Sequence, residues 1–247
     1  AIDPSSEKSK GSILGDKTRM ETLCNNPKVF IRPSPSAGSL GGVARKTRET
    51  IILCEAAGYD VVFIETVGVG QSETAVHSMS DFFLLLMLSG AGDDLQGIKR
   101  GIMEMSDLIA ITKADGTNKD KASMAKALYA NALHLFPPTE STWVPTALTS
   151  SAVTKEGLPE ILAKIEEYFA LVKGNGYYAH KRREQAKFWM YETINESLKN
   201  SFYENPLIEE CIGNYEASVL AGKTESFTAA EELLEMYYKR KEAENRE

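Results

Sequence analysis

Short apolar runs alternate with helical patterns along the first two thirds of the chain, and this alternation strongly restricts the possible folds. The runs are rich in β-branched residues and lack a two-residue period. They cover residues 29–32, 60–66, 82–88, 108–112 and 142–145. The helical patterns between and after them cover residues 41–57, 95–105, 119–136 and 161–169. Strands without alternation are typical of parallel sheets covered on both faces, so the pattern predicts an α/β fold with a doubly wound, mostly parallel sheet.

The remainder of the chain carries no strand pattern. A break at residues 174–176 separates it from the α/β part, which predicts one domain over 1–173 and an all-helical appendage over 174–247. Asn205 followed by Pro206 predicts a helix start, and Gly222 predicts the end of that helix. Thr228 and Glu231 have the spacing of a capping box, which predicts the start of the last helix.

Composition excludes several classes of protein. The 247 residues contain 28 Lys and Arg against 35 Asp and Glu, a net charge of −7, which argues against general nucleic-acid binding. No apolar run approaches the roughly 20 residues that cross a bilayer, so we expect no membrane span. Three widely spaced cysteines without a C-x-x-C pair predict neither a disulfide framework nor a zinc site.

Two motifs at predicted strand ends suggest nucleotide chemistry. Glu65 and Gly68 follow the run at 60–66, where a carboxylate can hold Mg²⁺ through water and a glycine N–H can meet a γ-phosphate. This motif alone is equally compatible with an ordinary turn. The run at 108–112 ends in Thr112-Lys113-Ala114-Asp115, where the carboxylate can accept both N–H groups of a guanine edge and the lysine stem can cover the base.

A third motif lies beyond the next predicted strand. Ser151 and Ala152 precede Gly157 and a helix, and a loop of this kind lies beside the base and offers it a backbone N–H. Because adenine presents an acceptor where guanine presents an N–H, the arrangement favours GTP. Three such motifs in this order indicate a GTP-binding fold, although Thr112 stands where asparagine is commoner.

Longer segments carry a closer resemblance. They are IDPSS at 2–6, GSILGDKTRM at 11–20, RPSPS at 32–36, LGGVARKTR at 40–48, ETVGVGQSE at 65–73 and GAGDDLQGIKRG at 90–101. Over essentially its whole length the chain resembles the methylmalonyl-CoA mutase-associated GTPases, formerly labelled LAO/AO transport system kinases. The resemblance implies a P-loop GTPase fold of the SIMIBI type with a C-terminal dimerisation element. It also implies a G protein that loads and protects an adenosylcobalamin-dependent methylmalonyl-CoA mutase or a related acyl-CoA mutase.

The resemblance also assigns roles to residues. Asp3, Asp16 and Glu65 match the acidic residues around Mg²⁺, and Asp3, Glu65 and Gly68 would serve hydrolysis of GTP to GDP and phosphate. Base recognition falls to Lys113, Asp115, Ser151 and Ala152. The loop that couples the nucleotide state to the mutase would use Asp93, Gln96 and Lys99. The helical tail would form a homodimer, and the expected location is the bacterial cytoplasm, or the mitochondrial matrix if the source is eukaryotic.

One expected motif is absent from the sequence. No G-x-x-x-x-G-K-[ST] phosphate loop occurs, and Gly222-Lys223-Thr224 does not supply one because position 217 is Ala217 and a helix precedes it. We expect the chain to begin within its first strand unit, so that the phosphate loop lies upstream of Ala1. The chain as written is therefore predicted not to hydrolyse GTP, whereas the intact protein would do so.

Three alternative functions have less support in the sequence. A nicotinamide site at Gly68 and Gly70 is disfavoured because Glu73 replaces the third glycine of the fingerprint and would repel a pyrophosphate. A dimeric scaffold on a GTPase fold that does not hydrolyse GTP is the stronger alternative. The older kinase-like transport ATPase label is a third possibility, for which the sequence offers no acceptor site.

Overall fold

The computed structural model describes residues 2–3, 20–32, 34–35, 40–66, 72–89 and 100–244. By their contacts these residues form two compact units, Ala1–Phe188 and Trp189–Glu247, and the boundary falls inside a long helix. The predicted boundary between 173 and 174 coincides instead with a local break, because α7 (Leu158–Gly174) ends there and α8 (Tyr177–Tyr203) begins. No helix in the described ranges is long and apolar enough to cross a membrane.

The first unit is built on a parallel sheet of three strands in the order β3 (Leu84–Leu88), β4 (Leu108–Thr112) and β5 (Thr146–Thr149). The chain passes from β3 to β4 through α5 (Arg100–Met105) and from β4 to β5 through α6 (Lys119–Leu133). A separate parallel pair joins the two-residue strands β1 (Ile2–Asp3) and β2 (Ser34–Pro35). The described part also contains α2 (Glu21–Cys24), α3 (Leu40–Ala56) and α4 (Ser72–His77).

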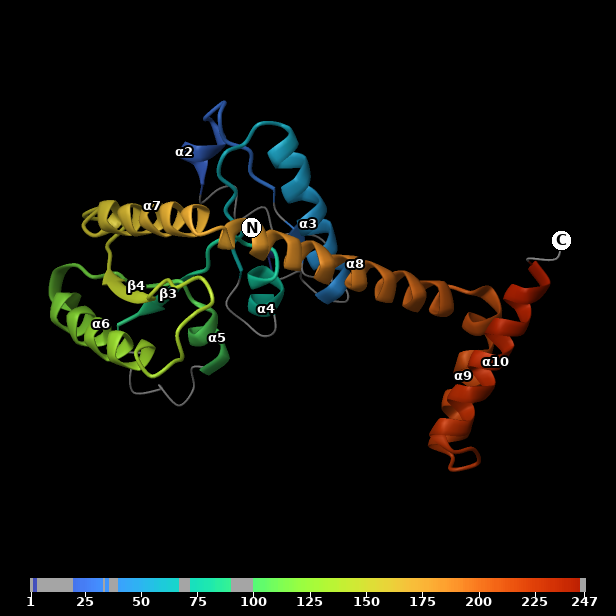
Figure 1. Ribbon diagram of the computed structural model, residues 1–247. Coiled ribbons are helices and arrows are strands. Elements are labelled where there is room, and N and C mark those ends of the chain that lie inside the picture. The colour runs from blue at the N-terminus through green and yellow to red at the C-terminus, as the bar shows by residue number, and fades with distance from the viewer. Residues whose placement is uncertain are drawn as a thin grey trace. The chain divides into compact units, whose positions relative to one another are not determined.

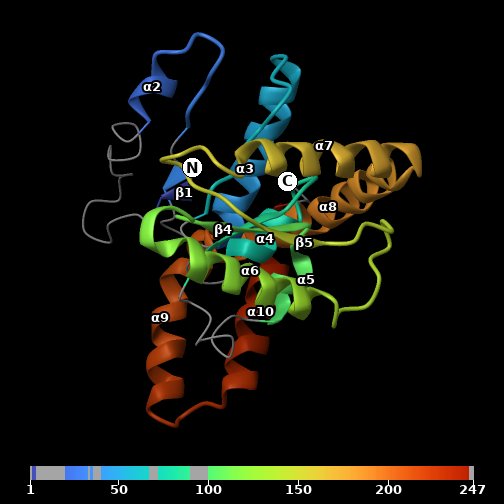
Figure 2. The ribbon, with the colours of Figure 1, turned by 90° about the vertical axis from the view of Figure 1, so that its left-hand side faces the viewer.

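Helices cover both faces of the sheet. Ile109 and Ile111 of β4 pack with Met103 of α5 and with the inner face of α6. Leu108 and Ala110, on the opposite face of the same strand, pack with Ile161 of α7. Figures 1 and 2 show α6 and α7 on opposite sides of β4. The central strand is therefore buried on both faces, which confirms the predicted doubly wound α/β arrangement.

Three predicted strands are wrong. Residues 29–32 are irregular, because Val29 closes a turn by donating its N–H to the Asn26 carbonyl. The predicted run at 60–66 is also irregular, and the Phe63 side chain is 86% exposed. A β-branched run forms a strand only where a neighbouring backbone supplies hydrogen bonds, and no described strand pairs with residues 61–66.

The third wrong prediction concerns residues 142–145, because the strand begins later in the chain than predicted. Thr142 has φ = 62°, a left-handed conformation that a β-branched residue does not adopt in a strand. Trp143 is turned into the domain, where its indole N–H donates to the Asp107 carbonyl at 2.8 Å. Since Pro145 has no N–H for a sheet, pairing begins one residue later, at Thr146 of β5.

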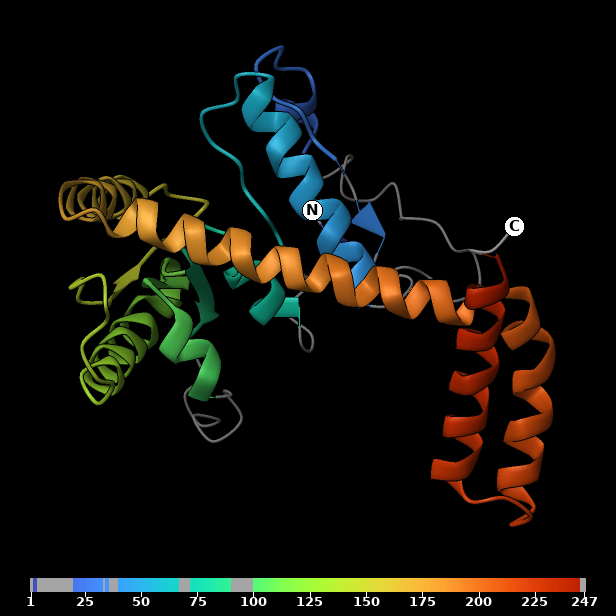
Figure 3. The same ribbon diagram turned by 45° about the vertical axis from the view of Figure 1, so that its right-hand side comes forward.

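The second unit consists of the end of α8 together with α9 (Pro206–Leu220) and α10 (Ser226–Glu244). Helices α9 and α10 lie side by side as an antiparallel pair (Figure 3). Their shared core is formed by Ile208, Leu233 and Tyr237, with Phe202 of α8 packed against it. The unit therefore has a small apolar core of its own.

Helix ends in this unit test the capping predictions. The Asn205 side chain accepts a hydrogen bond from the Leu207 N–H at 3.0 Å, which confirms the predicted N-cap of α9. Helix α9 ends at Leu220, and Gly222 follows with φ = 66°, which confirms the predicted glycine stop. The capping box at Thr228 is wrong because α10 begins two residues earlier, at Ser226.

Candidate guanine-nucleotide site

Two loops meet at the carboxyl edge of the sheet, one after β4 and one after β5. Thr112, the last residue of β4, donates its hydroxyl to the Met87 carbonyl of β3 at 3.0 Å. The Ala114 N–H donates to the Ser150 carbonyl, also at 3.0 Å, and this bond ties the first loop to the second. In open parallel sheets this edge is where ligands bind, so the two loops form a candidate binding site.

Asp115 and Ser151 are the polar centre of this edge. Ser151 is completely buried, and its hydroxyl donates a hydrogen bond to Oδ2 of Asp115. The Asp115 side chain is half-buried, whereas Lys113 beside it is exposed. A carboxylate has about four lone-pair positions, so the bond from Ser151 leaves Asp115 able to accept two further N–H groups. The contact therefore orients the carboxylate without using up its capacity to bind a base.

The second loop is held from within by the same serine. The Ser151 hydroxyl oxygen accepts hydrogen bonds from the N–H groups of Val153 and Thr154, each at 3.1 Å. The Ser151 N–H donates to the Glu156 carbonyl at 3.0 Å. Ala152 is exposed, and its N–H meets no acceptor among the described residues. The loop thus leaves one backbone donor, at Ala152, directly after the serine that binds the Asp115 carboxylate.

Gly157 closes the second loop against β5. Its φ is 79°, and a Cβ placed on it would lie 1.9 Å from the Thr149 carbonyl oxygen. No other residue fits this close approach between two backbones, which gives the glycine in the sequence motif a steric reason. The loop therefore returns to α7 at a fixed position.

An exposed ion pair links the two loops from outside. Lys119 Nζ lies 2.9 Å from Glu156 Oε2, and this partner raises the pKa of the Lys119 ammonium above its ordinary value. Because both side chains are more than half exposed, the pair adds little to stability. The pattern in the sequence gave no reason to connect these two residues, since the fold alone brings them together.

The acidic residues predicted for Mg²⁺ are described only in part. Glu65 is exposed and forms no hydrogen bond or ion pair with the described residues, so its carboxylate is accessible. The Asp3 backbone lies in β1, while its side chain, Asp16 and Gly68 lie outside the described residues. In the described ranges no three His, Cys, Asp or Glu side chains converge as a metal site. Carboxylate oxygens are nevertheless the donors that Mg²⁺ prefers.

The predicted coupling loop cannot be placed. Asp93, Gln96 and Lys99 all fall between residues 90 and 99, outside the described residues. The helix that follows this segment, α5, packs on the sheet through Met103. The assignments of these three residues therefore stay predictions.

A buried polar cluster lies at the other end of the strands. The Phe83 N–H donates to Asp107 Oδ2 at 2.8 Å, and Lys181 Nζ donates to the Asp81 carbonyl at 3.0 Å. Burial raises the pKa of Asp107 and lowers that of Lys181. Burial, and then the nearby Lys181 charge, lower the pKa of His77 to about 4. Asp81 and Asp107 come shortly before β3 and β4, and Lys181 reaches Asp81 from α8, so the cluster does not belong to the loops at the carboxyl edge.

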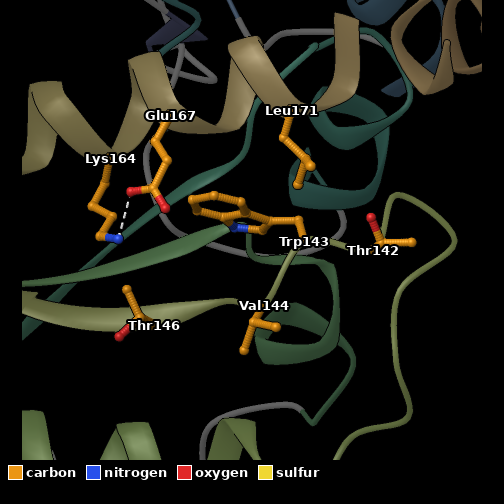
Figure 4. A pocket seen from close by; sticks show the side chains of 7 residues that line it. All are labelled: Thr142, Trp143, Val144, Thr146, Lys164, Glu167 and Leu171. Atoms are coloured by element: carbon orange, nitrogen blue, oxygen red, sulfur yellow. Dashed lines mark hydrogen bonds and ion pairs between the residues drawn. The ribbon is translucent and has the colours of Figure 1, made fainter. Parts of the chain in front are cut away.

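A shallow hollow of about 390 Å³ also lies away from that edge. It is lined by Thr142, Trp143, Val144, Thr146, Lys164, Glu167 and Leu171. Figure 4 shows the Lys164–Glu167 ion pair of α7 beside the Trp143 ring. The hollow borders the amino end of β5, whereas Ser151 follows its carboxyl end. It is therefore separate from the candidate nucleotide site.

Comparison with known proteins places this geometry in a family. A profile described as "Methylmalonyl Co-A mutase-associated GTPase MeaB" matches residues 1–207. A "Putative GTPase" from Caulobacter vibrioides is 47% identical over 95% of this chain and 72% of its own length. A mouse (Mus musculus) protein named "Methylmalonic aciduria type A homolog, mitochondrial" is 46% identical over 97% of this chain and 58% of its own length.

A solved structure agrees with the sequence comparisons. The chain matches the "Crystal structure of LAO/AO transport system kinase" with a TM-score of 0.69 and 34% identity, over 95% of this chain and 69% of that chain. The profile covers well over half of the residues, and the same GTPase description recurs among the relatives. The chain therefore belongs to the methylmalonyl-CoA mutase-associated GTPase family, as its sequence motifs predict.

Proposed function

We propose that this edge of the sheet binds GTP and GDP by their guanine base. The observation that carries the proposal is the Asp115 carboxylate, oriented by the buried hydroxyl of Ser151, which the exposed residue Ala152 follows directly in the chain. Guanine presents two N–H groups that the carboxylate can accept and a carbonyl that the Ala152 N–H can meet. The Lys113 stem would cover one face of the base.

Hydrolysis of GTP is proposed for a protein that also carries a phosphate loop. Asp3, Asp16 and Glu65 would hold Mg²⁺, which neutralises charge on the β- and γ-phosphates when bound, and Gly68 would meet the γ-phosphate. The exposed Glu65 carboxylate is compatible with this role. The 247 residues contain no phosphate-loop motif, so this chain as written would lack the backbone N–H cradle and would not turn over GTP.

The family description supports a mutase as partner. We infer that the protein is a G-protein chaperone that loads the cofactor of an adenosylcobalamin-dependent acyl-CoA mutase and protects that enzyme. Asp93, Gln96 and Lys99 would report the nucleotide state to the mutase. The bacterial cytoplasm is the proposed location, or the mitochondrial matrix for a eukaryotic source, and the name of the mouse relative includes the word "mitochondrial".

A homodimer through the helical tail is part of the same proposal. Tyr191, Ile194 and Leu198 of α8 recur at helical spacing and are each about half exposed. A second copy would bury such a stripe. Replacing Leu198 by Glu should therefore shift a dimer toward monomer in sedimentation velocity, whereas Glu196→Gln, next to the stripe, should not. If the wild-type protein remains monomeric at protein concentrations of roughly tens of micromolar, that result would contradict the dimer.

The decisive test of nucleotide binding uses two forms of the protein. One is this chain, and the other is an extended form in which a segment carrying a G-x-x-x-x-G-K-[ST] phosphate loop is joined ahead of Ala1. The extended form should bind a fluorescent GDP analogue saturably, and this chain should bind it at least about 100-fold more weakly because it lacks the phosphate cradle. No saturable binding by the extended form would favour the scaffold alternative. GTP turnover by this chain would show that the phosphate loop is dispensable.

A further inference from the structure

We propose that Asn118 is a positioning residue that sets guanine specificity by fixing the backbone of Lys113. Asn118 is the last residue of the 3₁₀ turn η2 (Gly116–Asn118), directly before α6. It contacts both Lys113 and Asp115, and no sequence motif identified it. The inference rests on the proposed function, since it assigns the determinant of specificity within the same site.

The backbone of Lys113 adopts an unfavourable conformation. Its φ is 56°, in the left-handed region that residues with a Cβ rarely occupy. The neighbours on both sides are fixed, since Thr112 is bonded to the Met87 carbonyl and Ala114 to the Ser150 carbonyl. The chain therefore turns from the strand into the loop within this one residue, and such a conformation persists only where the surroundings hold it.

Asn118 supplies the contact that holds it. The Asn118 side-chain amide donates to the Lys113 carbonyl at 2.7 Å, across five residues. The Asn118 backbone N–H donates to the Asp115 carbonyl at 3.0 Å. One residue thus binds the carbonyl groups of both Lys113 and Asp115, which closes the loop between β4 and α6 and fixes their separation.

The other contacts of the loop cannot replace this one. The Ser151 hydroxyl orients the Asp115 side chain, and its other hydrogen bonds go to Val153 and Thr154 rather than to Lys113. The Lys119–Glu156 pair is exposed and contributes little. Without the Asn118 amide, the Asp115 side chain would keep its hydrogen bond from Ser151. The backbone of Lys113 and the start of the loop could then relax toward a negative φ. Asp115 recognises the base only when both guanine N–H groups align with its carboxylate. Loss of the Asn118 amide should therefore reduce the preference for guanine over related bases more than it reduces the stability of the fold.

The test measures discrimination between GDP and IDP in the extended form. IDP lacks the exocyclic amino group of guanine, so the ratio of its Kd to that of GDP reports how well Asp115 reads that group. Asn118→Ala and the isosteric Asn118→Asp, which cannot donate to the Lys113 carbonyl when ionised, should each lower this ratio about tenfold. The control Asn131→Asp adds the same charge on the exposed face of α6 and should change the ratio less than about twofold.

A double-mutant cycle tests whether Asn118 affects nucleotide specificity through the backbone of Lys113. Glycine adopts φ = 56° without strain, so in a Lys113→Gly background the loss of the Asn118 amide should change the ratio less than about twofold. Additive effects in the cycle, or an unchanged ratio in Asn118→Ala, would overturn the inference and leave the proposed function standing. If the wild-type extended form binds neither nucleotide, the proposed function fails and this inference fails with it.

Discussion

Ser151, in the loop that follows β5, is fully buried, and its hydroxyl donates to the carboxylate of Asp115, 36 residues earlier in the chain. The bond joins the ends of two neighbouring parallel strands. The same oxygen also accepts the N–H groups of Val153 and Thr154. One side chain therefore organises both loops of the proposed base site.

Replacing Ser151 by Ala should weaken guanine-nucleotide binding and also destabilise the fold. The change removes the donor to Asp115 and leaves two N–H groups without their acceptor, which costs about 1–3 kcal/mol in the free energy of unfolding. We expect GDP affinity in the extended form to fall about tenfold because the carboxylate loses its orientation. Urea titration and GDP titration measure the two effects separately.

Ser106→Ala is the matched control for Ser151. Ser106 is also buried, and its hydroxyl donates to the Met103 carbonyl at 2.7 Å, away from the two loops. It should lower stability without changing GDP affinity beyond about twofold. Equal losses of affinity in both variants would mean that Ser151 acts only through general stability.

Gly157→Ala should strongly destabilise the domain. The added Cβ would lie 1.9 Å from the Thr149 carbonyl oxygen, and the residue would also keep an unfavourable φ of 79°. The expected loss is about 2–4 kcal/mol, measured as a lower urea midpoint. Gly213→Ala makes the same substitution inside α9 with no atom within 4 Å, and should instead stabilise by about 0.5–1 kcal/mol. A tolerated Gly157→Ala would contradict the close approach.

Stability should fall as the pH drops below neutral, partly through His77. Its pKa is 6.5 when unfolded and about 4 when folded, so the unfolded state binds more protons between these values. The contribution of His77 is present above pH 6.5 and is lost as pH falls toward 4, by at most about 3 kcal/mol. Urea titrations at several pH values measure this slope.

His77→Gln should flatten the slope between pH 7 and pH 4, whereas His134→Gln, at an exposed position, should not. The variant comparison is needed because Asp107, whose pKa burial raises, acts in the opposite direction as the pH falls. An identical slope in wild type and His77→Gln would show that His77 is protonated as readily in the folded state as in the unfolded one.

Arg182 ties the start of α8 to the turn before β3. Its Nε lies 2.8 Å from Asp81 Oδ1, and its Nη2 lies 2.5 Å from Asp81 Oδ2 and 2.8 Å from Glu55 Oε1. Because this paired group is partly buried, Arg182→Ala should cost about 1–3 kcal/mol of stability. The exposed neighbour Arg183 provides the control, and its replacement by Ala should change stability by less than about 0.5 kcal/mol. Equal urea midpoints for Arg182→Ala and Arg183→Ala would contradict a stabilising role for Arg182.

The sequence was sufficient to predict the elements that depend on interactions between residues close together in the chain. The Asn205 cap, the Gly222 stop and the helices α3 and α6 follow from capping and periodicity, and the structure confirms them. The strand at 108–112 was predictable because its unbroken apolar run is buried on both faces. These features depend on neighbours close in the sequence or on burial alone.

The predictions that failed concern features that depend on residues far away in the chain. Residues 61–66 have strand composition but no described strand beside them. The strand after Trp143 is displaced because its indole bonds to Asp107, far away in sequence. In the candidate site, the motifs identified Lys113, Asp115 and Ser151, but only the fold brings Glu156 to Lys119 and Asn118 to the Lys113 carbonyl.

The central claim is that Asp115 reads guanine, and the most direct measurement is the preference of the extended form for GDP over XDP. Xanthine carries a carbonyl where guanine carries the amino group, so the Asp115→Asn amide can donate where the carboxylate cannot. Wild type should prefer GDP by at least about 100-fold, and Asp115→Asn should reverse the preference toward XDP. A variant that still prefers GDP as strongly as wild type would contradict the assignment of Asp115.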